Sequence, residues 1–320
     1  MSSYIIRRTL LLIPTILLVT IIVFITIRLI PGSIIDVMMG EMGTEALGEG
    51  FDREALISKL GLDVPIHEQY VMWLGDIITH GSLGNALRGQ ETVNEKLIAR
   101  IPVTFEIGVL ALIIALIIAI PIGIFSAIRQ DTIGDWFARG ISIIFISIPS
   151  FWMGTLIMIY PAKWWGWSPS MTLIRFSEDP IGNLQMFIVP SLVLGMVISG
   201  TTMRMTRTMM LEVLRQDYIR AAWAKGLTER TVVLRHAIKN ALIPVVTIVG
   251  MQIPYLIGGS VIIEQIFVLP GVGRLMIESL SFRDYPVVSG INLFIALIVV
   301  GVNLSVDLLY SYLDPRVRYK

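Results

Sequence analysis

The sequence contains no cysteine and only three histidines among its 320 residues. Without cysteine there can be no disulfide bond, no thiolate zinc site and no cysteine nucleophile. His67, His80 and His236 stand far apart, so they form neither an HExxH motif nor a pair of ligands four residues apart. The composition therefore predicts no metal site on this chain, and it favours solvent-facing or structural roles for the histidines.

Motifs for nucleotide binding and hydrolysis are also missing. None of the six lysines follows a glycine, so the GxxxxGK[ST] loop that holds ATP phosphates is absent, and so is Gly-x-Ser-x-Gly. Proton-coupled carriers and aspartyl intramembrane proteases need carboxylates inside their spans, but Glu106, Glu264 and Asp307 lie near the ends of the apolar runs. We therefore predict no catalytic residue, no enzymatic activity and no cofactor bound to this chain itself.

Charge is scarce, at 15% of residues against 55% hydrophobic residues. A soluble domain of this length would carry more charge. Six uncharged runs reach the length of about 18 residues that a helix needs to cross a bilayer. We expect an all-α, polytopic membrane protein with six transmembrane helices; five or seven spans are the alternatives, because the fourth run begins with polar residues. The runs are Thr9–Ile27, Ile107–Ile128, Gly140–Ala162, Pro180–Met203, Asn240–Ile263 and Tyr285–Val306.

Three regions follow from this pattern. Residues 1–30 contain the first span, which follows Arg7 and Arg8 and has no signal-peptide cleavage site, so we expect a retained anchor helix. Residues 31–100 hold eleven acidic and five basic residues, which predicts a loop region outside the cytoplasm. Residues 101–320 then form a five-span core, with a cytoplasmic hairpin at 204–243.

The distribution of positive charge predicts the orientation. Between Arg204 and Lys239 there are eight basic and three acidic residues, and residues 314–320 carry a net charge of +2. Basic loops stay on the cytoplasmic side. We therefore expect both termini and this hairpin in the cytoplasm, and the chain in the cell membrane. Nucleic-acid binding is the competing interpretation of a basic helical hairpin, but this segment is joined to a span at each end, which favours membrane topology.

The hairpin has a recognisable internal pattern. Asp217 is expected to cap a short helix over Tyr218–Lys225, with Ile219, Ala222 and Trp223 on one apolar face. Gly226 stands where a left-handed helix stop is needed, and Thr228 is expected to cap a second helix. The apolar face of that second helix is predicted to consist of Leu234, Ala237, Ile238, Ala241 and Leu242.

This segment resembles the cytoplasmic EAA loop of ABC-importer permeases. Ala221, Ala222 and Gly226 match its motif. Arg220 replaces the motif's glutamate, and Ile238-Lys239 stands at the usual spacing of its Leu-Pro. Both departures are similar to the dipeptide/oligopeptide/nickel branch, as are HGSLGNAL (80–87), SIPSFW (147–152) and EQIFVLPGVGRLMIESLSFRDYP (264–286). The chain is identified by resemblance as a first-permease (B-type) subunit of that family.

The resemblance implies the type I ABC-importer permease architecture and a set of partners. These are a second homologous permease, two ATP-binding subunits that hold ATP and Mg²⁺, an extracytoplasmic solute-binding protein and membrane lipid, with no nucleic acid. The function implied is import of di- or oligopeptides. Alternative solutes are nickel chelates, opines or oligosaccharides, and an ATP-independent carrier, a channel or an intramembrane enzyme are the alternatives from other classes.

The resemblance also implies roles for particular residues. Contact with the ATPase would involve Asp217, Tyr218, Arg220, Ala221, Ala222, Lys225 and Gly226; otherwise this helix only holds two spans together at the membrane surface. Gln252, Asn292 and Asn303 would line the translocation path, or else bond neighbouring helices. The residues expected to face the binding protein are Glu264, Pro270, Gly271, Gly273 and Asp284.

Overall fold

The computed structural model describes residues 2–29, 57, 63–166 and 172–313. Within these ranges the chain forms helices joined by short loops, with one isolated antiparallel bridge between Asn85 and Thr92. The long helices are α1 (Ser2–Arg28), α5 (Val93–Ile128), α8 (Pro180–Leu214), α11 (Ile238–Ile266) and α13 (Tyr285–Leu313). The shorter ones are α4 (Ile66–His80), α6 (Ile133–Ser147), α7 (Ser150–Trp165), α9 (Asp217–Ala224), α10 (Glu229–Thr231), the π-helix η1 (Val232–Ala237) and α12 (Val272–Ser281).

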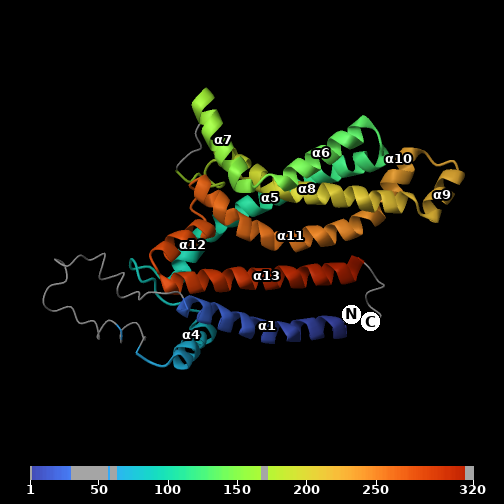
Figure 1. Ribbon diagram of the computed structural model, residues 1–320. Coiled ribbons are helices and arrows are strands. Elements are labelled where there is room, and N and C mark those ends of the chain that lie inside the picture. Colours follow the sequence, from blue (N-terminus) through green and yellow to red (C-terminus); the bar gives the residue numbers. More distant parts are fainter. Residues whose placement is uncertain (1, 30–56, 58–62, 167–171, 314–320) are drawn as a thin grey trace.

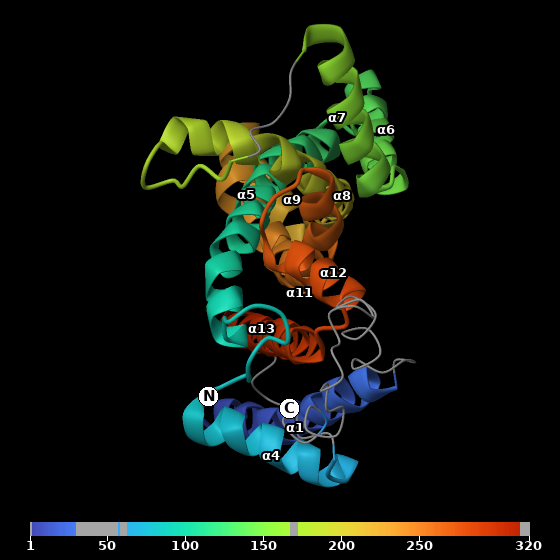
Figure 2. The same ribbon diagram turned by 90° about the vertical axis from the view of Figure 1, so that its left-hand side faces the viewer.

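The long helices lie side by side, α6 runs beside α8, and most of the other short helices lie toward the two ends of the bundle (Figure 1). The start of α1, the end of α13 and α9 lie at one end, whereas α4 and α12 lie at the other. Viewed along the bundle in Figure 2, α1 and α4 occupy one side and α7 the opposite side. The expected all-α, polytopic architecture is confirmed.

Among the described residues, five helical stretches are long and apolar enough to cross a membrane. The third expected span, Gly140–Ala162, is not one continuous helix. It is divided between α6 and α7, whose axes differ in direction by 95°. The break lies at Ile148-Pro149, because the proline ring pushes the preceding residue out of the helical conformation, and Ile148 is extended with φ −83° and ψ 121°. The described part of the chain thus contains five candidate spans and one bent helix pair.

Small residues bring α5 and α8 into close contact along the centre of the bundle. Every fourth residue of α5 from position 107 to position 127 lies on its buried face, and most of these residues are alanine or glycine. A Cβ atom added to Gly195 of α8 would lie 2.6 Å from the carbonyl oxygen of Ala111, and one added to Gly123 of α5 would lie 2.7 Å from Thr206. In a membrane such close packing drives association, because lipid is as apolar as leucine.

Local sequence explains where these two helices begin. Thr92 and Glu95 form a capping box at the start of α5, in which the Thr92 hydroxyl accepts from the Glu95 amide and the Glu95 carboxylate accepts from the Thr92 amide. The Asp179 carboxylate accepts from the amides of Ile181 and Gly182 at the start of α8, where Pro180 occupies the first helical position.

α4 packs on α1. Its Tyr70 and Trp73 rings contact Phe24 at centroid distances of 5.5 and 5.7 Å, and the hydroxyls of Tyr70 and Thr20 are hydrogen-bonded at 2.9 Å. Phe24 and Thr20 are among the few buried residues of α1. The other long contact of α1 is with α13, so this helix lies at the edge of the bundle.

Candidate functional site

The hairpin between α8 and α11 forms as its sequence predicts at the turn. Gly226 has a φ of +79°, in the left-handed region that favours glycine. The Gly226 amide donates to the Trp223 carbonyl at 2.9 Å, which closes the end of α9. The Thr228 hydroxyl then accepts from the Thr231 amide at 3.4 Å, so the expected cap of the second helix is confirmed.

Two details of the predicted hairpin are wrong. Asp217 is the first residue of α9 and not its cap; the cap position is Gln216, which makes no side-chain bond, and the Asp217 carboxylate forms an ion pair with Arg220 one turn later. Leu234 was expected on the apolar face, yet it is 56% exposed. The π-helical turn η1 inserts an extra residue, and Val232 and Val233 occupy the buried positions instead.

The hairpin is firmly seated on the ends of the long helices. Ile219 and Ala222 are buried in a cluster with Met210 of α8 and Ala127 of α5. The Asn240 side chain at the start of α11 donates both to the Tyr218 hydroxyl and to the His236 carbonyl, each at 3.0 Å. α9 is thus packed against the end of α8 and hydrogen-bonded to the start of α11.

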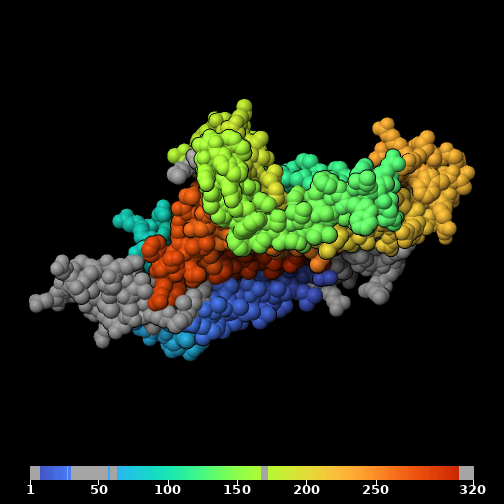
Figure 3. All heavy atoms as spheres, turned by 45° about the horizontal axis from the view of Figure 1, so that its top comes forward, coloured from blue at the N-terminus to red at the C-terminus, as the bar shows by residue number. Residues whose placement is uncertain are grey.

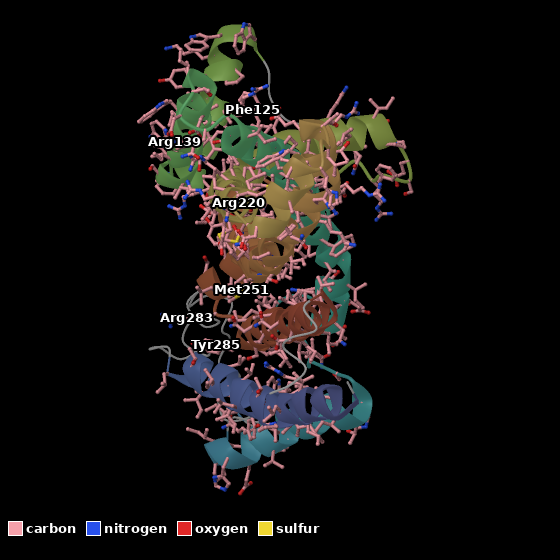
Figure 4. The ribbon with its side chains drawn as sticks, turned by 90° about the vertical axis from the view of Figure 1, so that its right-hand side faces the viewer. Phe125, Arg139, Arg220, Met251, Arg283 and Tyr285 are labelled. Carbon is pink, nitrogen blue, oxygen red and sulfur yellow. The ribbon has the colours of Figure 1, made fainter. Side chains whose placement is uncertain are left out.

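One surface of the hairpin remains uncovered at the end of the molecule (Figure 4 labels Arg220 there). It displays the apolar side chains of Tyr218, Trp223, Leu227 and Leu234, together with exposed Asp217, Arg220, Ala221 and Lys225. An exposed apolar patch with a charged rim is typical of a protein–protein docking surface. The hairpin therefore presents exposed aromatic side chains on a short helix that is packed against the ends of the long helices.

The three residues expected along the path do not form one cluster. Gln252 donates to the Thr202 hydroxyl of α8 at 3.4 Å and is half-buried. Asn292 and Asn303 lie on α13, about 16 Å apart along its axis at 1.5 Å per residue. Asn292 is half-buried and Asn303 is exposed. Gln252 thus has the inter-helix contact that the alternative interpretation expected.

The residues expected to face a binding protein are mostly inside the structure. Glu264 is fully buried, and its carboxylate accepts from the Thr104 hydroxyl at 2.7 Å and from the Arg274 amide at 2.9 Å. Thr104 in turn accepts from the Val272 amide at 2.8 Å. Gly271 and Gly273 are needed beside it, because a Cβ atom at either position would lie less than 3.0 Å from the Glu264 carboxylate. This corrects the sequence interpretation: Glu264, Gly271 and Gly273 join α5, α11 and α12, and half-buried Pro270 begins their turn.

Asp284 is likewise buried and structural. Its carboxylate accepts from the backbone amides of Leu87 and Arg88, which fixes the loop before α5 against the loop before α13. Arg88 lies over the Phe282 ring at 3.9 Å. The exposed residues of the segment 264–286 are Gln265, Val268, Leu280, Ser281 and Phe282.

The sequence analysis missed a buried charge cluster. Asp135 at the start of α6 is fully buried, and its carboxylate accepts two hydrogen bonds from Arg207 of α8, at 2.8 and 2.9 Å, and one from Ser126 of α5. The signal in the sequence was an acidic residue a few positions before one long uncharged run and a basic residue a few positions after another. Within the described residues, no group of three or more histidine, aspartate or glutamate side chains could hold a metal ion.

Comparison with known proteins agrees with this geometry. The sequence profile of the binding-protein-dependent transport system inner membrane component matches residues 119–319, and that of the N-terminal membrane component matches residues 1–108. The dipeptide transport system permease protein DppB of Escherichia coli K12 is 36% identical over 344 residues, and the oligopeptide transport system permease protein AppB of Bacillus subtilis 168 is 39% identical over 322 residues. Both alignments cover 100% of each chain.

The fold is shared with solved ABC transporters. A chain of an amino acid ABC transporter crystallised with histidines superposes with a TM-score of 0.51 at 15% identity, over 70% of this chain and 94% of the other. A chain of the inward-facing MetNI methionine ABC transporter superposes with a TM-score of 0.50 at 18% identity, over 67% and 95%. By profile, full-length similarity and fold, this multi-pass membrane protein belongs to the family of inner-membrane components of binding-protein-dependent transport systems.

Proposed function

We propose that this chain is the permease subunit of an ATP-driven importer of di- or oligopeptides. The observation that carries the proposal is full-length similarity, above 35% identity, to permeases named for dipeptide and oligopeptide transport. In this role the chain forms part of the translocation path together with a second, homologous permease. An extracytoplasmic binding protein delivers the solute to the end of the bundle where α12 lies.

ATP hydrolysis takes place on two separate subunits, which hold ATP and Mg²⁺. Those subunits dock on the exposed surface of α9, where Trp223 and Tyr218 are the anchors and Arg220 and Lys225 form the rim. Closure of the ATPases moves α9, and the buried contacts of Ile219 and Ala222 transmit the movement to α8 and α11. The orientation that this requires, with α9 and both termini in the cytoplasm, is supported by the surplus of basic residues at that end.

Replacement of Trp223 by alanine tests the docking role. Trp223 is 43% exposed, so its removal takes away contact area without opening the core. Aromatic anchors at interfaces typically contribute about 2 kcal/mol, which corresponds to a roughly 30-fold loss of ATPase affinity. We expect peptide-stimulated ATP hydrolysis of the reconstituted complex to fall accordingly, at unchanged permease insertion.

Trp165→Ala is the matched control, because Trp165 is also exposed, at 75%, but lies at the far end of α7. It should leave ATPase binding and stimulated hydrolysis unchanged. Equal activity of the Trp223→Ala complex and the wild type would exclude the docking role, and a permease that never co-purifies with an ATPase would exclude the proposed function.

A further inference from the structure

A basic cleft lies between α6 and α8, next to the Asp135–Arg207 pair. Its volume is about 250 Å³, and its walls contain three arginines and no carboxylate. Arg207 is neutralised by Asp135, which leaves Arg139 and Arg204 as a surplus of two positive charges. Asp131 is the other acidic residue nearby, and even with its charge counted the cluster keeps a surplus of one. The cleft therefore has the charge to hold an anion.

Arg139 has hydrogen-bond donors that no side chain or carbonyl accepts. Its Nε and Nη2 atoms are both buried and both lack a hydrogen-bond partner; the nearest carboxylate oxygen, on Asp135, is 3.5 Å from Nη2. The guanidinium is held in place from the other side by the Trp136 ring, at 4.0 Å. Arg204 has no ion pair among the described residues. Buried guanidinium donors without an acceptor are costly unless a ligand supplies one.

The hydroxyls that line the cleft are already committed as donors. Ser142 donates to the Gly200 carbonyl at 2.8 Å, and Thr208 donates to the Arg204 carbonyl at 3.0 Å. α6 and α8 approach each other closely beside the cleft, because a Cβ atom added to Gly200 would lie 2.8 Å from the Ser142 carbonyl oxygen. A ligand must therefore be recognised by the two guanidinium groups, which favours a phosphate over a neutral polar group.

The two arginines lie at the boundary of the apolar layer. Arg139 directly precedes the uncharged run that begins at Gly140, and Arg204 directly follows the run that ends at Met203. Both are thus the first charges on the same side of a bilayer, at the depth of the lipid headgroups. Apolar side chains of α6 continue from the cleft into the uncharged run: Ile143 lies in the cleft wall, and Ile144 and Ile146 are exposed further along the helix. Figure 3 shows α6 on the outer face of the bundle, beside α7.

We propose that this cleft binds the phosphate headgroup of an anionic phospholipid. Arg139 and Arg204 hold the phosphate, and Ile143 and the neighbouring apolar residues of α6 contact the acyl chain. In the orientation proposed above the lipid belongs to the cytoplasmic leaflet, where basic clefts between spans bind anionic headgroups. Because α6, α8 and the α5 end meet at Asp135, a lipid in this position braces the bent α6–α7 pair against α8.

Photo-crosslinking of the intact transporter complex measures lipid binding at this cleft. The probe is phosphatidylglycerol with a photoreactive acyl chain, titrated into phosphatidylcholine vesicles that contain the complex. Adducts on residues 133–147 are then quantified by peptide mass spectrometry. Each direct guanidinium contact with the phosphate contributes about 1 kcal/mol, so Arg139→Gln together with Arg204→Gln should raise the half-saturating lipid fraction about 30-fold.

Arg129→Gln is the matched control, because it removes an exposed charge at the same end of the bundle but outside the cleft. It should leave the half-saturating fraction unchanged. If the double variant does not assemble, each single variant should raise that fraction about fivefold. Equal labelling of the wild type and the arginine variants, or of phosphatidylglycerol and an equally photoreactive phosphatidylcholine, would overturn the proposal. Displacement of the lipid by millimolar inorganic phosphate would also overturn it, since the site would then take a soluble oxyanion.

Discussion

At the residue scale, three carboxylates in apolar helices, those of Asp135, Asp307 and Glu264, are stabilised by different kinds of partner. Asp135 is paired with Arg207, and Asp307 of α13 is paired with Arg8 of α1 at 2.8 Å, as its position near a helix end suggested. Glu264 forms no ion pair with any described residue and accepts hydrogen bonds from neutral donors, of which the Thr104 hydroxyl is the nearest. The free-energy cost of burying such a carboxylate is offset only if its hydrogen-bond donors are held in the right positions.

Thr104→Val should destabilise the protein by about 3 kcal/mol, because it leaves both the Glu264 carboxylate and the Val272 amide without their partner. Thr104→Ser retains the hydroxyl and should cost less than about 1 kcal/mol. The midpoint of thermal unfolding of the purified permease in detergent measures both. Equal midpoints for the valine and serine variants would show that the hydroxyl does not hold the outer end together.

At the element scale, the bend between α6 and α7 is the main departure from a simple six-helix pattern. Length and hydrophobicity are the same for a straight and a bent span, so composition could not distinguish them. Pro149 indicated where the bend would lie. The angle of a proline kink, however, depends on how the neighbouring helices pack around it. Here Gly154 of α7 packs near Ile266 and Phe267, which holds α7 across the outer end of α11.

Pulsed electron spin resonance can measure this bend, since the chain has no native cysteine. Spin labels on Ile133→Cys and Trp165→Cys would report the distance between the far ends of α6 and α7, and both positions are exposed. Two helices of 15 and 16 residues that differ by 95° predict about 32 Å between their ends, whereas a straight span predicts about 48 Å. A single distance near the longer value in lipid would contradict the bend.

At the scale of the whole molecule, the two ends of the bundle have different constructions. The end with α12 is closed by hydrogen bonds that the carboxylates of Glu264 and Asp284 accept, and by an apolar cluster that includes Leu275 and Ile291. The end with α9 carries an exposed apolar surface and most of the basic residues. This asymmetry is expected of a protein that receives solute at one side and mechanical work at the other.

Single cysteines distinguish the two ends. Ser281→Cys lies in the outer segment and Leu234→Cys in the hairpin, and both side chains are exposed. A membrane-impermeant maleimide should label Ser281→Cys from outside the cell membrane, once any cell wall or outer membrane has been made permeable. It should label Leu234→Cys only in inverted membrane vesicles. The reverse pattern would place the hairpin outside and remove the basis for coupling to a cytoplasmic ATPase.

Much of this protein is determined by short-range sequence. Hydrophobic run length specifies the spans, the surplus of basic residues predicts their orientation, and Gly226 and Thr228 specify the turn of the hairpin, because each depends on one residue type or on local composition. The burial of Glu264 and Asp284, the exposure of Leu234 and the pairing of Asp135 with Arg207 were decided only by the tertiary structure. In each of these cases the deciding partner lies on another helix or the register is shifted by a π turn, and local pattern carries no information about either.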